Sequence, residues 1–569
     1  MSKKMFIAFA VMLGLFFGCE QGANKADLVL KNGKIVTVDE SRPEAQAVAI
    51  SGNKIMAVGS NEEIQAMVGG STEVVDLGGK LAVPGFIEGH GHFTSLGRAK
   101  MVLDLTKVKN WREIVQMVSD AAKNAKPGEW IFGRGWHQEK WDSTPSGSVD
   151  GVPTHHTLSA VSRENPVYLG HASGHASFAN AAALEAAGIS AASTDPSGGT
   201  IVRSANNEPT GLLREKAQGL VGKAIAEYQA SRSPAELQAE AEEQVRLAGE
   251  EALSKGVTTF HDAGTSFETI DFFKMLADDG KLPVRLYVMV RFQTNDEMAE
   301  KLPSYRMIGH GGDFLTVRSI KRQIDGALGA HGAWLLEPYE DLADNTGLVL
   351  EPVEEVTRTC EIAVEHGFQV NTHAIGDRAN REVLDIYEKI FATAENSDDL
   401  RWRIEHAQHV HPNDVPRFAG LGVIASVQGV HCTSDGPWIP KRLGDARTKE
   451  TSYLWRDLWD SGATITNGTD VPVEDVSPIE SFYSTVARKM NNGEKFHPAQ
   501  SLTREEALKT YTLNNAYAAF EEDSKGSITP GKLADVVVLS QDIMTIPEDD
   551  IPSTQVVYTI LDGKIVYQQ

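Results

Sequence analysis

The stretch VPGFIEGHGHFTS, from Val83 to Ser95, ends an apolar run with two histidines, His90 and His92, that are one residue apart. In an extended strand, residues two positions apart project to the same side, so both imidazoles would leave one strand end together. Gly89 and Gly91 remove side chains that could crowd the two rings. The pattern indicates half of a zinc-type site, with two polar residues in a solvated loop as the alternative.

Seven more strand-like runs follow this stretch, and helical stretches separate most of them. Alternation of this kind predicts βα units and a parallel sheet. Eight such strands predict an α/β fold with a (β/α)8 TIM barrel, whose active site lies at the carboxyl ends of the strands. The seven later runs are VTTFHDAG (257–264), LPVRLYVMV (282–290), LTVRSIKRQIDGALG (315–329), FQVNTHAIGD (368–377), RWRIEHAQ (401–408), VIASVQG (423–429) and ATITNGTDVPV (463–473).

Both ends of the chain have a different pattern. Short alternating runs such as ADLVLKNGKIVTVDE and TQVVYTILDGKIVYQQ are bounded by glycine-containing turns, which predicts β-hairpins. Neither end could form a stable core alone, so we predict one small β-sandwich built from residues 26–84 and 520–569. The barrel would then span residues 85–519, with an insertion at about 104–233 between its first two strands.

The bulk composition is that of a globular protein, with 569 residues of which 41% are hydrophobic and 23% are charged. Acidic residues outnumber basic residues by 78 to 54, which gives a net charge of −24. This charge argues against nucleic acid or an anionic lipid surface as the main partner. Cys360 and Cys432 are too few for a disulfide framework, and we expect both to be small buried residues.

The N-terminal segment, residues 1–19, is typical of an exported protein. Lys3 and Lys4 precede a short apolar run, which fits a secretory signal peptide better than a transmembrane helix. The run ends in LFFGC, which resembles the lipobox of bacterial lipoproteins, so we expect lipidation at Cys19 and a lipid anchor as the only membrane contact. A plain signal peptide cut nearby is the alternative. Either way, we expect the mature chain in the cell envelope, on the periplasmic side or at the cell surface.

Further ionisable residues stand at the predicted strand ends. Lys321 lies in the fourth strand, His373 and His406 end the fifth and sixth strands, and Asp470 follows the eighth. Because the carboxyl ends of the strands meet at one rim of a barrel, we expect these side chains near the first histidine pair. Each of them alone has an ordinary explanation, such as a surface lysine or a capping aspartate. Their recurrence at one strand end after another favours a metal site.

Together these motifs resemble the amidohydrolase superfamily of metal-dependent hydrolases. Within it, the chain is similar to the amidohydrolase-3 group, which includes YtcJ-like proteins and N-substituted formamide deformylases. PGFIEGHGH resembles the family's Pro-Gly-Phe-Ile-Asp-x-His-x-His, and IKRQIDGALG resembles its Lys-x-x-x-Asp-Gly-x-Leu-Gly segment. THAIGDRAN, RIEHAQ and NGTDVPV match the later strand ends, and SGHASFANAAAL matches the family's insertion. Glu88 stands where the family commonly has aspartate, and the sequence assigns it no role.

The resemblance implies a divalent-metal site, with two zinc ions as the expected occupants. One ion would be held by His90, His92 and Asp470, and the second by His373 and His406, with Lys321 bridging both as a carbamate. If Lys321 is unmodified, the alternative is a one-metal site that uses His90, His92, Asp470 and either His373 or His406. Asp470 would act as general base and then general acid in the hydrolysis of a small-molecule amide, whether N-formyl, N-acyl or cyclic. The oligomeric state is not determined by the sequence, and a homodimer is one option.

The insertion is expected to lie over the mouth of the barrel and to shape the substrate pocket. His175, in SGHAS, is a candidate catalytic residue that would polarise the scissile carbonyl, with packing of its own loop as the alternative. Trp136 and Trp141 could form an apolar wall of the pocket, although buried aromatic packing is the favoured interpretation.

Two other functions stay open from the sequence. A one-metal deaminase of the same superfamily usually carries a glutamate shortly after the histidine of the fifth strand, whereas THAIGDR offers Asp377. A non-catalytic, lipid-tethered solute-binding protein is expected to lack several of the ligand residues, and all of them are present in this chain.

Overall fold

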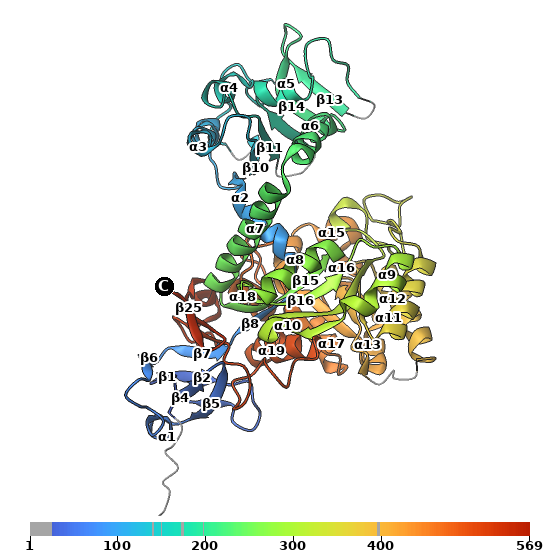
Figure 1. The fold of residues 1–569 in the computed structure, drawn as a ribbon. Coiled ribbons are helices and arrows are strands. Elements are labelled where there is room, and N and C mark those ends of the chain that lie inside the picture. Colours follow the sequence, from blue (N-terminus) through green and yellow to red (C-terminus); the bar gives the residue numbers. More distant parts are fainter. Residues whose placement is uncertain (1–24, 139–140, 150, 172–175, 197–198, 395–398) are drawn as a thin grey trace, which may run out of the picture.

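Eight parallel strands form the centre of the molecule (Figure 1). The computed structural model describes residues 25–569 apart from 139–140, 150, 172–175, 197–198 and 395–398. The strands are hydrogen-bonded in the order β22, β21, β20, β19, β18, β16, β15, β8. They are β8 (Phe86–Gly91), β15 (Val257–Thr265), β16 (Arg285–Val290), β18 (Leu315–Gln323), β19 (Gln369–Ala374), β20 (Arg403–His406), β21 (Ile424–Gln428) and β22 (Ile465–Gly468). A short strand, β17 (Met307–Gly309), pairs antiparallel with β18.

The two ends of this strand order, β8 and β22, lie next to each other and nearly close the ring. Just beyond β22, the backbone N–H of Asp470 donates to the carbonyl of His90 at 2.7 Å. The N–H of His92 donates to the carbonyl of Val471 at 2.8 Å. The predicted eight-stranded parallel barrel is therefore confirmed, and its last contacts are made by residues of the candidate site.

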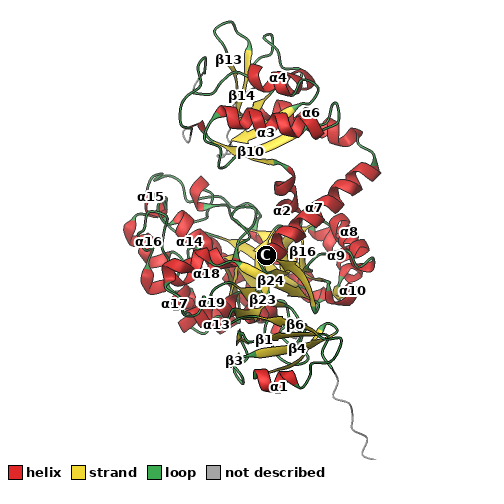
Figure 2. Ribbon diagram, turned by 90° about the vertical axis from the view of Figure 1, so that its left-hand side faces the viewer, coloured by secondary structure: helices red, strands yellow, loops and turns green. Residues whose placement is uncertain are grey.

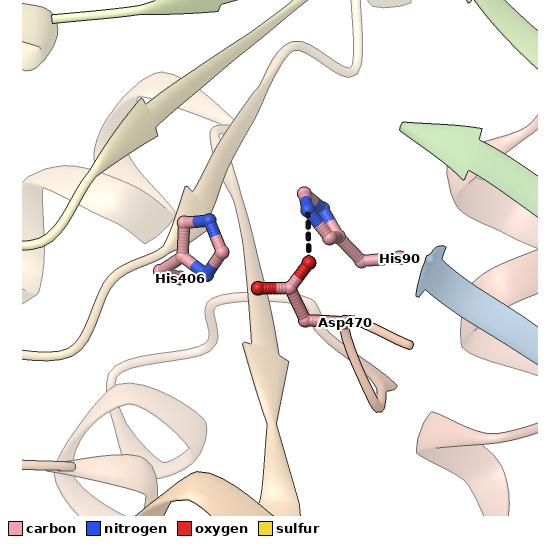
Figure 3. A group of neighbouring side chains, drawn as sticks. All are labelled: His90, His406 and Asp470. Carbon is pink, nitrogen blue, oxygen red and sulfur yellow. Dashed lines mark ion pairs between the residues drawn. The ribbon is translucent and has the colours of Figure 1, made fainter. Parts of the chain in front are cut away.

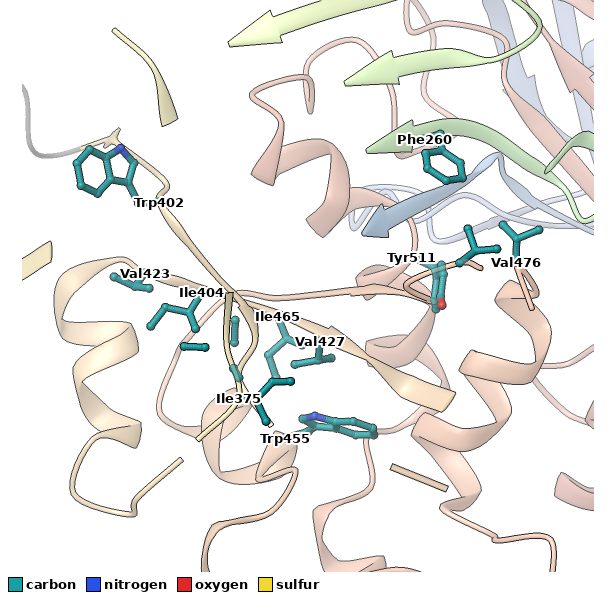
Figure 4. Close-up of a cluster of buried hydrophobic side chains, with 14 of the residues drawn as sticks. Phe260, Ile375, Trp402, Ile404, Val423, Val427, Trp455, Ile465, Val476 and Tyr511 are labelled. Carbon is teal, nitrogen blue, oxygen red and sulfur yellow. The ribbon is translucent and has the colours of Figure 1, made fainter. Parts of the chain in front are cut away.

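Buried apolar side chains join the strands to the helices around them. All six residues of β16 are buried, as expected when helices cover the outside of a parallel barrel. Helix α12 (Asp377–Phe391) buries Val383, Leu384 and Tyr387 on one face. Figure 4 shows part of this core, including Trp402, Ile404, Val427 and Trp455. The other helices that accompany the barrel are α8 (Phe267–Asp278), α9 (Asn295–Tyr305), α10 (His310–Asp313), α11 (Val353–His366), α13 (Val415–Leu421), α14 (Gly429–Asp435), α15 (Ile439–Leu443), α16 (Asp445–Thr451), α17 (Trp455–Asp460), α18 (Pro478–Ala487), α19 (Arg504–Thr510) and α20 (Leu513–Ala518).

The chain between β8 and β15 forms a second sheet with its own hydrophobic core. Two helices that pack against each other, α2 (Phe93–Met101) and α7 (Pro234–Ser254), connect it to the barrel. Figures 1 and 2 show this sheet beyond one end of the barrel. Its strands, in the order β13, β14, β12, β11, β10, β9, are β9 (Leu103–Asp104), β10 (Ile131–Trp136), β11 (Val167–His171), β12 (Ala176–Ala179), β13 (Gly199–Arg203) and β14 (Pro209–Glu215), and its helices are α3 (Trp111–Asn124), α4 (His156–Val161), α5 (Ala181–Ala186) and α6 (Gln218–Ser231).

Strands from both ends of the chain form two further sheets, which Figure 1 draws in blue and red. The six-stranded sheet, in the order β25, β24, β23, β7, β2, β3, combines the first and last segments, and a four-stranded sheet has the order β5, β4, β1, β6. Leu30, Val48 and Val538 belong to one buried cluster shared by both sheets. The elements are β1 (Leu28–Lys31), β2 (Lys34–Val36), β3 (Glu44–Ala45), β4 (Ala47–Ser51), β5 (Lys54–Gly59), α1 (Asn61–Gln65), β6 (Glu73–Asp76), β7 (Leu81–Pro84), β23 (Val536–Leu539), β24 (Val556–Leu561) and β25 (Lys564–Gln568).

The predicted N-terminal targeting segment lies outside the described residues, and Cys19 lies there with it. Cys360 and Cys432 are both buried and are not joined in a disulfide. Within the described part of the chain, no helix is both long enough and apolar enough to cross a membrane.

Candidate metal centre

Three of the predicted ligands meet at the carboxyl end of the barrel. One potential ligand atom from each of His90, His406 and Asp470 lies within 4.8 Å of the other two (Figure 3). His90 belongs to β8, His406 is the last residue of β20, and Asp470 lies just after β22. The Oδ1 atom of Asp470 is 3.6 Å from His90 Nε2 and 3.3 Å from His92 Nε2. Residues that are far apart in the sequence thus form one compact group.

Lys321 reaches the same group from β18. Its Nζ atom lies 3.2 Å from His90 Nε2, and the side chain is buried. Burial is the main reason why the pKa of Lys321 falls from 10.5 to about 8. An amine with this pKa keeps a neutral fraction near neutral pH, and the neutral amine is the form that reacts with carbon dioxide to give a carbamate.

His373 and His92 lie around this group. The ring of His373 is 4.4 Å from the ring of His406, measured between centroids. Its Nε2 atom is buried and lies 3.4 Å from Oδ1 of Asp325. His92 is the most exposed of the predicted ligands, with 26% of its side chain accessible. The structure therefore places all six predicted metal ligands at the carboxyl end of the barrel, with His90, His406 and Asp470 closest together.

The backbone is strained at two of the candidate ligands. His406 has a φ of 77° and Asp470 a φ of 58°, in the left-handed region that residues other than glycine rarely adopt. Such conformations cost about 1–3 kcal/mol each and persist only where the surrounding structure enforces them. At His406 the consequence is visible, because Glu405 and His406 are consecutive and yet both contact His90. A regular strand would point these two side chains to opposite faces.

Glu405 contacts His90 on the Nδ1 side of its ring. The sequence did not single out Glu405. Its carboxylate accepts a hydrogen bond from His90 Nδ1 and also lies 2.7 Å from Arg403 Nε. Burial raises the pKa of Glu405, but Arg403 and His90 hold that pKa well below its usual value. An ionised carboxylate keeps the proton on His90 Nδ1, which leaves the Nε2 lone pair free to bind a metal. The only sequence signal was the position of Glu405 directly before a candidate ligand in RIEH.

Two more buried residues fix the surroundings of the ligands. Gln428, at the end of β21, has its Oε1 atom 2.7 Å from His406 Nδ1, so His406 also keeps its Nε2 atom free. Asp325 accepts hydrogen bonds from three backbone N–H groups in the loops after β18 and β19. Burial raises the pKa of Asp325 to about 7. These contacts join neighbouring strand ends into one rigid rim.

Glu88 ties the two edges of the barrel together next to the ligands. Its carboxylate accepts hydrogen bonds from the N–H of Thr469 at 2.7 Å, the hydroxyl of Thr469 at 3.0 Å and the N–H of His90 at 3.2 Å. Burial raises the pKa of Glu88 to about 8. Glu88 thus has a structural role that the sequence did not reveal, because it holds β22 to β8 where each strand delivers a ligand.

His431 is a further neighbour of the site that the sequence did not indicate. It lies on α14, with its ring nearly parallel to that of His406 and 6.5 Å away between centroids. Its Nδ1 atom is 3.2 Å from Gln408 Nε2, whereas its Nε2 atom is buried without a hydrogen-bond partner among the described residues.

The two tryptophans of the insertion that the sequence singled out lie away from the ligand group. His175 is outside the described residues. Trp136 and Trp141 are buried in the core of the insertion, with ring centroids 6.1 Å apart, and Trp136 Nε1 donates to the carbonyl of Leu169 at 2.9 Å. Both tryptophans therefore pack the insertion itself.

The donor set fits a divalent transition metal such as zinc. It combines imidazole nitrogens with one carboxylate, which are the ligands that zinc takes in catalytic sites. His90 and His406 each have Nδ1 engaged by a buried partner, which directs Nε2 toward the shared centre. The Nε2 atom of His373, which lies 3.4 Å from Asp325 Oδ1, is a further candidate nitrogen donor beside them.

Comparison with known proteins gives consistent matches along nearly the whole chain. A protein-family model described as the amidohydrolase family matches residues 73–567. The chain is 35% identical to the protein LONG AFTER FAR-RED 3 of Arabidopsis thaliana, over 95% of this chain and 92% of that protein. It is 32% identical to YtcJ of Bacillus subtilis (strain 168), over 94% and 98% of the two chains. It is 27% identical to an N-substituted formamide deformylase of Arthrobacter pascens, over 95% and 98%.

The fold has close counterparts among solved structures. The crystal structure of an uncharacterized metal-dependent hydrolase from Pyrococcus horikoshii OT3 has a TM-score of 0.72 and 28% sequence identity to this chain. That comparison covers 92% of this chain and 99% of the other. The similarity therefore extends beyond the barrel to almost the whole architecture.

Proposed function

We propose, on the premise that this chain belongs to the amidohydrolase family, that it is a metal-dependent hydrolase which cleaves an amide-type C–N bond with water. The observation that carries this proposal is the convergence of His90, His406 and Asp470 within 4.8 Å at the carboxyl end of the barrel. The similarity to a formamide deformylase supports a C–N bond outside ordinary peptides. N-formyl, N-acyl and cyclic amides are the candidate substrates.

The metal would be held by the side chains around His90. We assign one ion to His90, His92 and Asp470, and a second to His373 and His406, with Lys321 as a shared carbamate ligand. The 3.2 Å contact between Lys321 Nζ and His90 Nε2 and the lowered pKa of Lys321 support this assignment. A single ion on His90, His406 and Asp470 is the alternative. A divalent cation in such a site lowers the pKa of water from about 15.7 to about 7 and polarises a carbonyl oxygen.

Asp470 carries the proton in the proposed reaction. Burial raises the pKa of Asp470, but the hydrogen bond from His92 and the neighbouring His90 hold it well below its usual value. The carboxylate is therefore ionised and can accept a proton from the attacking water. It then donates this proton to the leaving nitrogen as the C–N bond breaks, which gives a carboxylic acid and an amine.

The substrate would approach between the barrel and the insertion. A cavity of about 900 Å³ is lined by α2, α6 and α7, by β9 and β10 of the insertion, and by Val471–Val476, the loop directly after Asp470. The six predicted ligands do not line it, so it would be an approach to the site and not the site itself. Val473 in this loop is 66% exposed. We therefore propose that the insertion, residues 104–233, shapes the substrate pocket. In the proposed domain division, residues 85–519 form the barrel and the paired chain ends form the composite β-sandwich.

Export to the cell envelope also stays a proposal. It rests on the lipobox-like LFFGC and on acylation of Cys19. Metabolic labelling with a palmitate analogue, compared between the wild type and Cys19→Ser, tests it. Equal labelling of both proteins would contradict lipidation at this residue.

The decisive experiment combines metal analysis with a panel of N-formyl, N-acyl and cyclic amides. We expect His406→Ala to lose bound metal and more than about 100-fold in kcat/KM, because it removes a ligand rather than a supporting residue. His310→Ala is the matched control, since His310 lies on α10, where it pairs with Asp278 and is 30% exposed. Unchanged metal content and turnover in His406→Ala would contradict the site. Release of ammonia without carboxylate from amidine-type substrates would support a deaminase instead.

A further inference from the structure

Arg291 stands at the carboxyl end of the barrel without a described acid in direct contact. It directly follows β16, and the strand register places it beside Lys321 of β18. Its side chain is partly buried, and burial lowers the pKa of its guanidinium, an effect that the nearby Glu351, Asp470 and Asp262 offset only in part. Among the residues that the structure describes, none forms an ion pair with it. Arginines that lose solvent in this way are normally paired with an anion.

Three uncharged contacts hold the Arg291 side chain in place. Its Nη2 atom donates to Gln323 Oε1 at 2.6 Å. Its guanidinium carbon lies 5.0 Å from the centroid of the Phe292 ring. Its aliphatic part packs on Gly264, where an added Cβ would lie 2.5 Å from Arg291 Cδ and where φ is 123°. The head group is thus positioned by uncharged contacts, and no described acid pairs with it directly.

The guanidinium lies close to the candidate metal centre, on the side of the barrel mouth. Gln323, its hydrogen-bond partner, is the register neighbour of His373 and lies two residues beyond Lys321. The charge of Arg291 adds to the effect of burial in lowering the pKa of Lys321. Phe292 is 72% exposed and has a φ of 74°, so a strained backbone presents an aromatic ring to solvent beside the guanidinium.

We propose that Arg291 binds the carboxylate of the substrate, so that this hydrolase prefers amides that carry a carboxylate, such as N-formyl or N-acyl amino acids. The planar guanidinium matches a carboxylate through two parallel hydrogen bonds. The exposed ring of Phe292 offers apolar surface to the substituent of such an amino acid. The inference rests on the proposed function and adds a substrate class to it.

A carbamate on Lys321 would present a planar anion of the same kind. The contact with Gln323 lies further toward the mouth of the barrel than Lys321, which favours an anion that arrives from solvent. The experiment therefore has separate measurements for the substrate and for Lys321.

Two substrates that differ only in the carboxylate test the proposal: N-formylphenylalanine and N-formylphenethylamine. We expect the zinc-loaded wild type to favour the first by about 10- to 100-fold in kcat/KM, which is the range of a hydrogen-bonded charge pair. In Arg291→Met this ratio should fall to about one. Gln323→Glu should lower it as well, because it supplies Arg291 with an internal counter-charge at the 2.6 Å contact. Arg358→Met, at a 55% exposed arginine of α11, is the control and should keep the wild-type ratio.

Binding without turnover separates this inference from the proposed function. Calorimetry with 3-phenylpropionate and with the neutral 3-phenylpropanol should show preference for the carboxylate in the wild type and loss of that preference in Arg291→Met. If neither formamide is hydrolysed but this pattern is found, the carboxylate site stands and the proposed hydrolysis fails for these substrates. If both formamides are hydrolysed equally well by the wild type, the hydrolase stands and the carboxylate site is overturned.

Two further results would also overturn the inference. One is equal loss of activity on both substrates in Arg291→Met, which would indicate a purely structural role. The other is loss of the Lys321 carbamate signal in Arg291→Met, followed by NMR with isotope-labelled bicarbonate, together with an unchanged preference for the carboxylate. That result would assign Arg291 to the lysine instead of the substrate.

Discussion

At the scale of single residues, the candidate centre depends on buried partners that orient its ligands. His90 is engaged through Nδ1 by Glu405, and Glu405 is in turn paired with Arg403. All three side chains are almost completely buried. These contacts fix the orientation of the His90 ring and direct its Nε2 atom toward the candidate site. Supporting residues raise metal affinity in this way.

We expect Glu405→Gln to weaken zinc binding by about 10- to 100-fold, because an amide no longer supplies the charge that fixes the proton on His90. The change also leaves Arg403 without its counter-charge. Competition with a chromophoric chelator measures the affinity. Glu361→Gln is the matched control, since Glu361 is a 51% exposed carboxylate on α11. An affinity equal to that of the wild type would show that Glu405 does not orient His90.

The buried His409 should contribute to the loss of stability at acidic pH. It is buried, its Nδ1 atom is 2.9 Å from Ser452 Oγ, and burial, followed by Arg447, lowers its pKa from 6.5 to about 3. Below pH 6.5 the unfolded chain binds a proton that the folded chain excludes. The stability that His409 contributes is therefore complete above pH 6.5 and is lost as the pH falls toward 3.

We expect His409→Asn to reduce the loss of unfolding free energy between pH 6.5 and pH 4.5 by about 2–3 kcal/mol. Asparagine can keep a hydrogen bond to Ser452 and does not titrate. Urea unfolding at a series of pH values measures the effect. Parallel pH profiles for the wild type and the variant would contradict the prediction.

At the scale of elements, the seam between β8 and β22 completes the barrel and positions the site. Glu88 bridges it through Thr469, and the backbone of Asp470 bonds to His90 across it. Gly89 makes the close approach possible, because an added Cβ would lie 2.4 Å from the carbonyl oxygen of Asn467. Glycine is therefore needed at position 89 because a side chain would not fit there. Backbone conformation is not the reason, since the φ of Gly89 lies outside the left-handed region.

We expect Gly89→Ala to destabilise the protein by about 1–3 kcal/mol, because the new methyl group meets the backbone of a neighbouring strand. It should also weaken metal binding, since the seam carries His90 and Asp470. Gly420→Ala is the matched control: Gly420 lies in α13 with nothing within 4 Å of an added Cβ. Alanine there should be neutral or stabilise by up to about 1 kcal/mol. The denaturant midpoints of Gly89→Ala and Gly420→Ala provide the measurement. Equal midpoints would contradict a steric clash at the contact between β8 and β22.

At the scale of the whole molecule, a buried ion pair joins the barrel to the sheets formed by the chain ends. Arg285, at the start of β16, donates to Asp535 at 2.8 Å and to Asp562 at 3.0 Å. Burial raises the pKa of Asp535, but Arg285 more than offsets this effect and holds that pKa below its usual value. The barrel and the sheets of the chain ends are therefore coupled energetically as well as by the covalent chain.

We expect Arg285→Met to cost about 3–5 kcal/mol, because it leaves Asp535 buried without its counter-charge. The double variant Arg285→Met/Asp535→Leu should recover most of this loss, since it removes both charges. Denaturant midpoints of the two variants and the wild type provide the measurement. Equal destabilisation in the single and the double variant would show that packing around Arg285, and not the uncompensated charge, sets the cost.

The barrel and the position of the candidate ligands at its rim could be predicted from the sequence because their signals are local. An apolar run that ends in His, Lys or Asp is visible one strand at a time, as in NTHAIGD around His373 or TNGTD around Asp470. Parallel strands in a barrel share one rim, so chain order alone brings such residues together. The pairing of both chain ends was also visible, because each has alternating strands and too few residues for a core.

The partners of the ligands could be recognised only in the tertiary structure. Glu405 and His406 are consecutive and yet both contact His90, because His406 adopts a positive φ that no residue pattern predicts. Arg291 is unusual because no described acid forms an ion pair with it, although Glu351, Asp470 and Asp262 lie near enough to raise its pKa. This arrangement depends on strands that are distant in sequence. From the sequence alone, periodicity determined which residues arrive at the rim. The tertiary structure decided which of them touch and which charges stay unpaired, because contact and burial depend on neighbours that the chain brings together only when it folds.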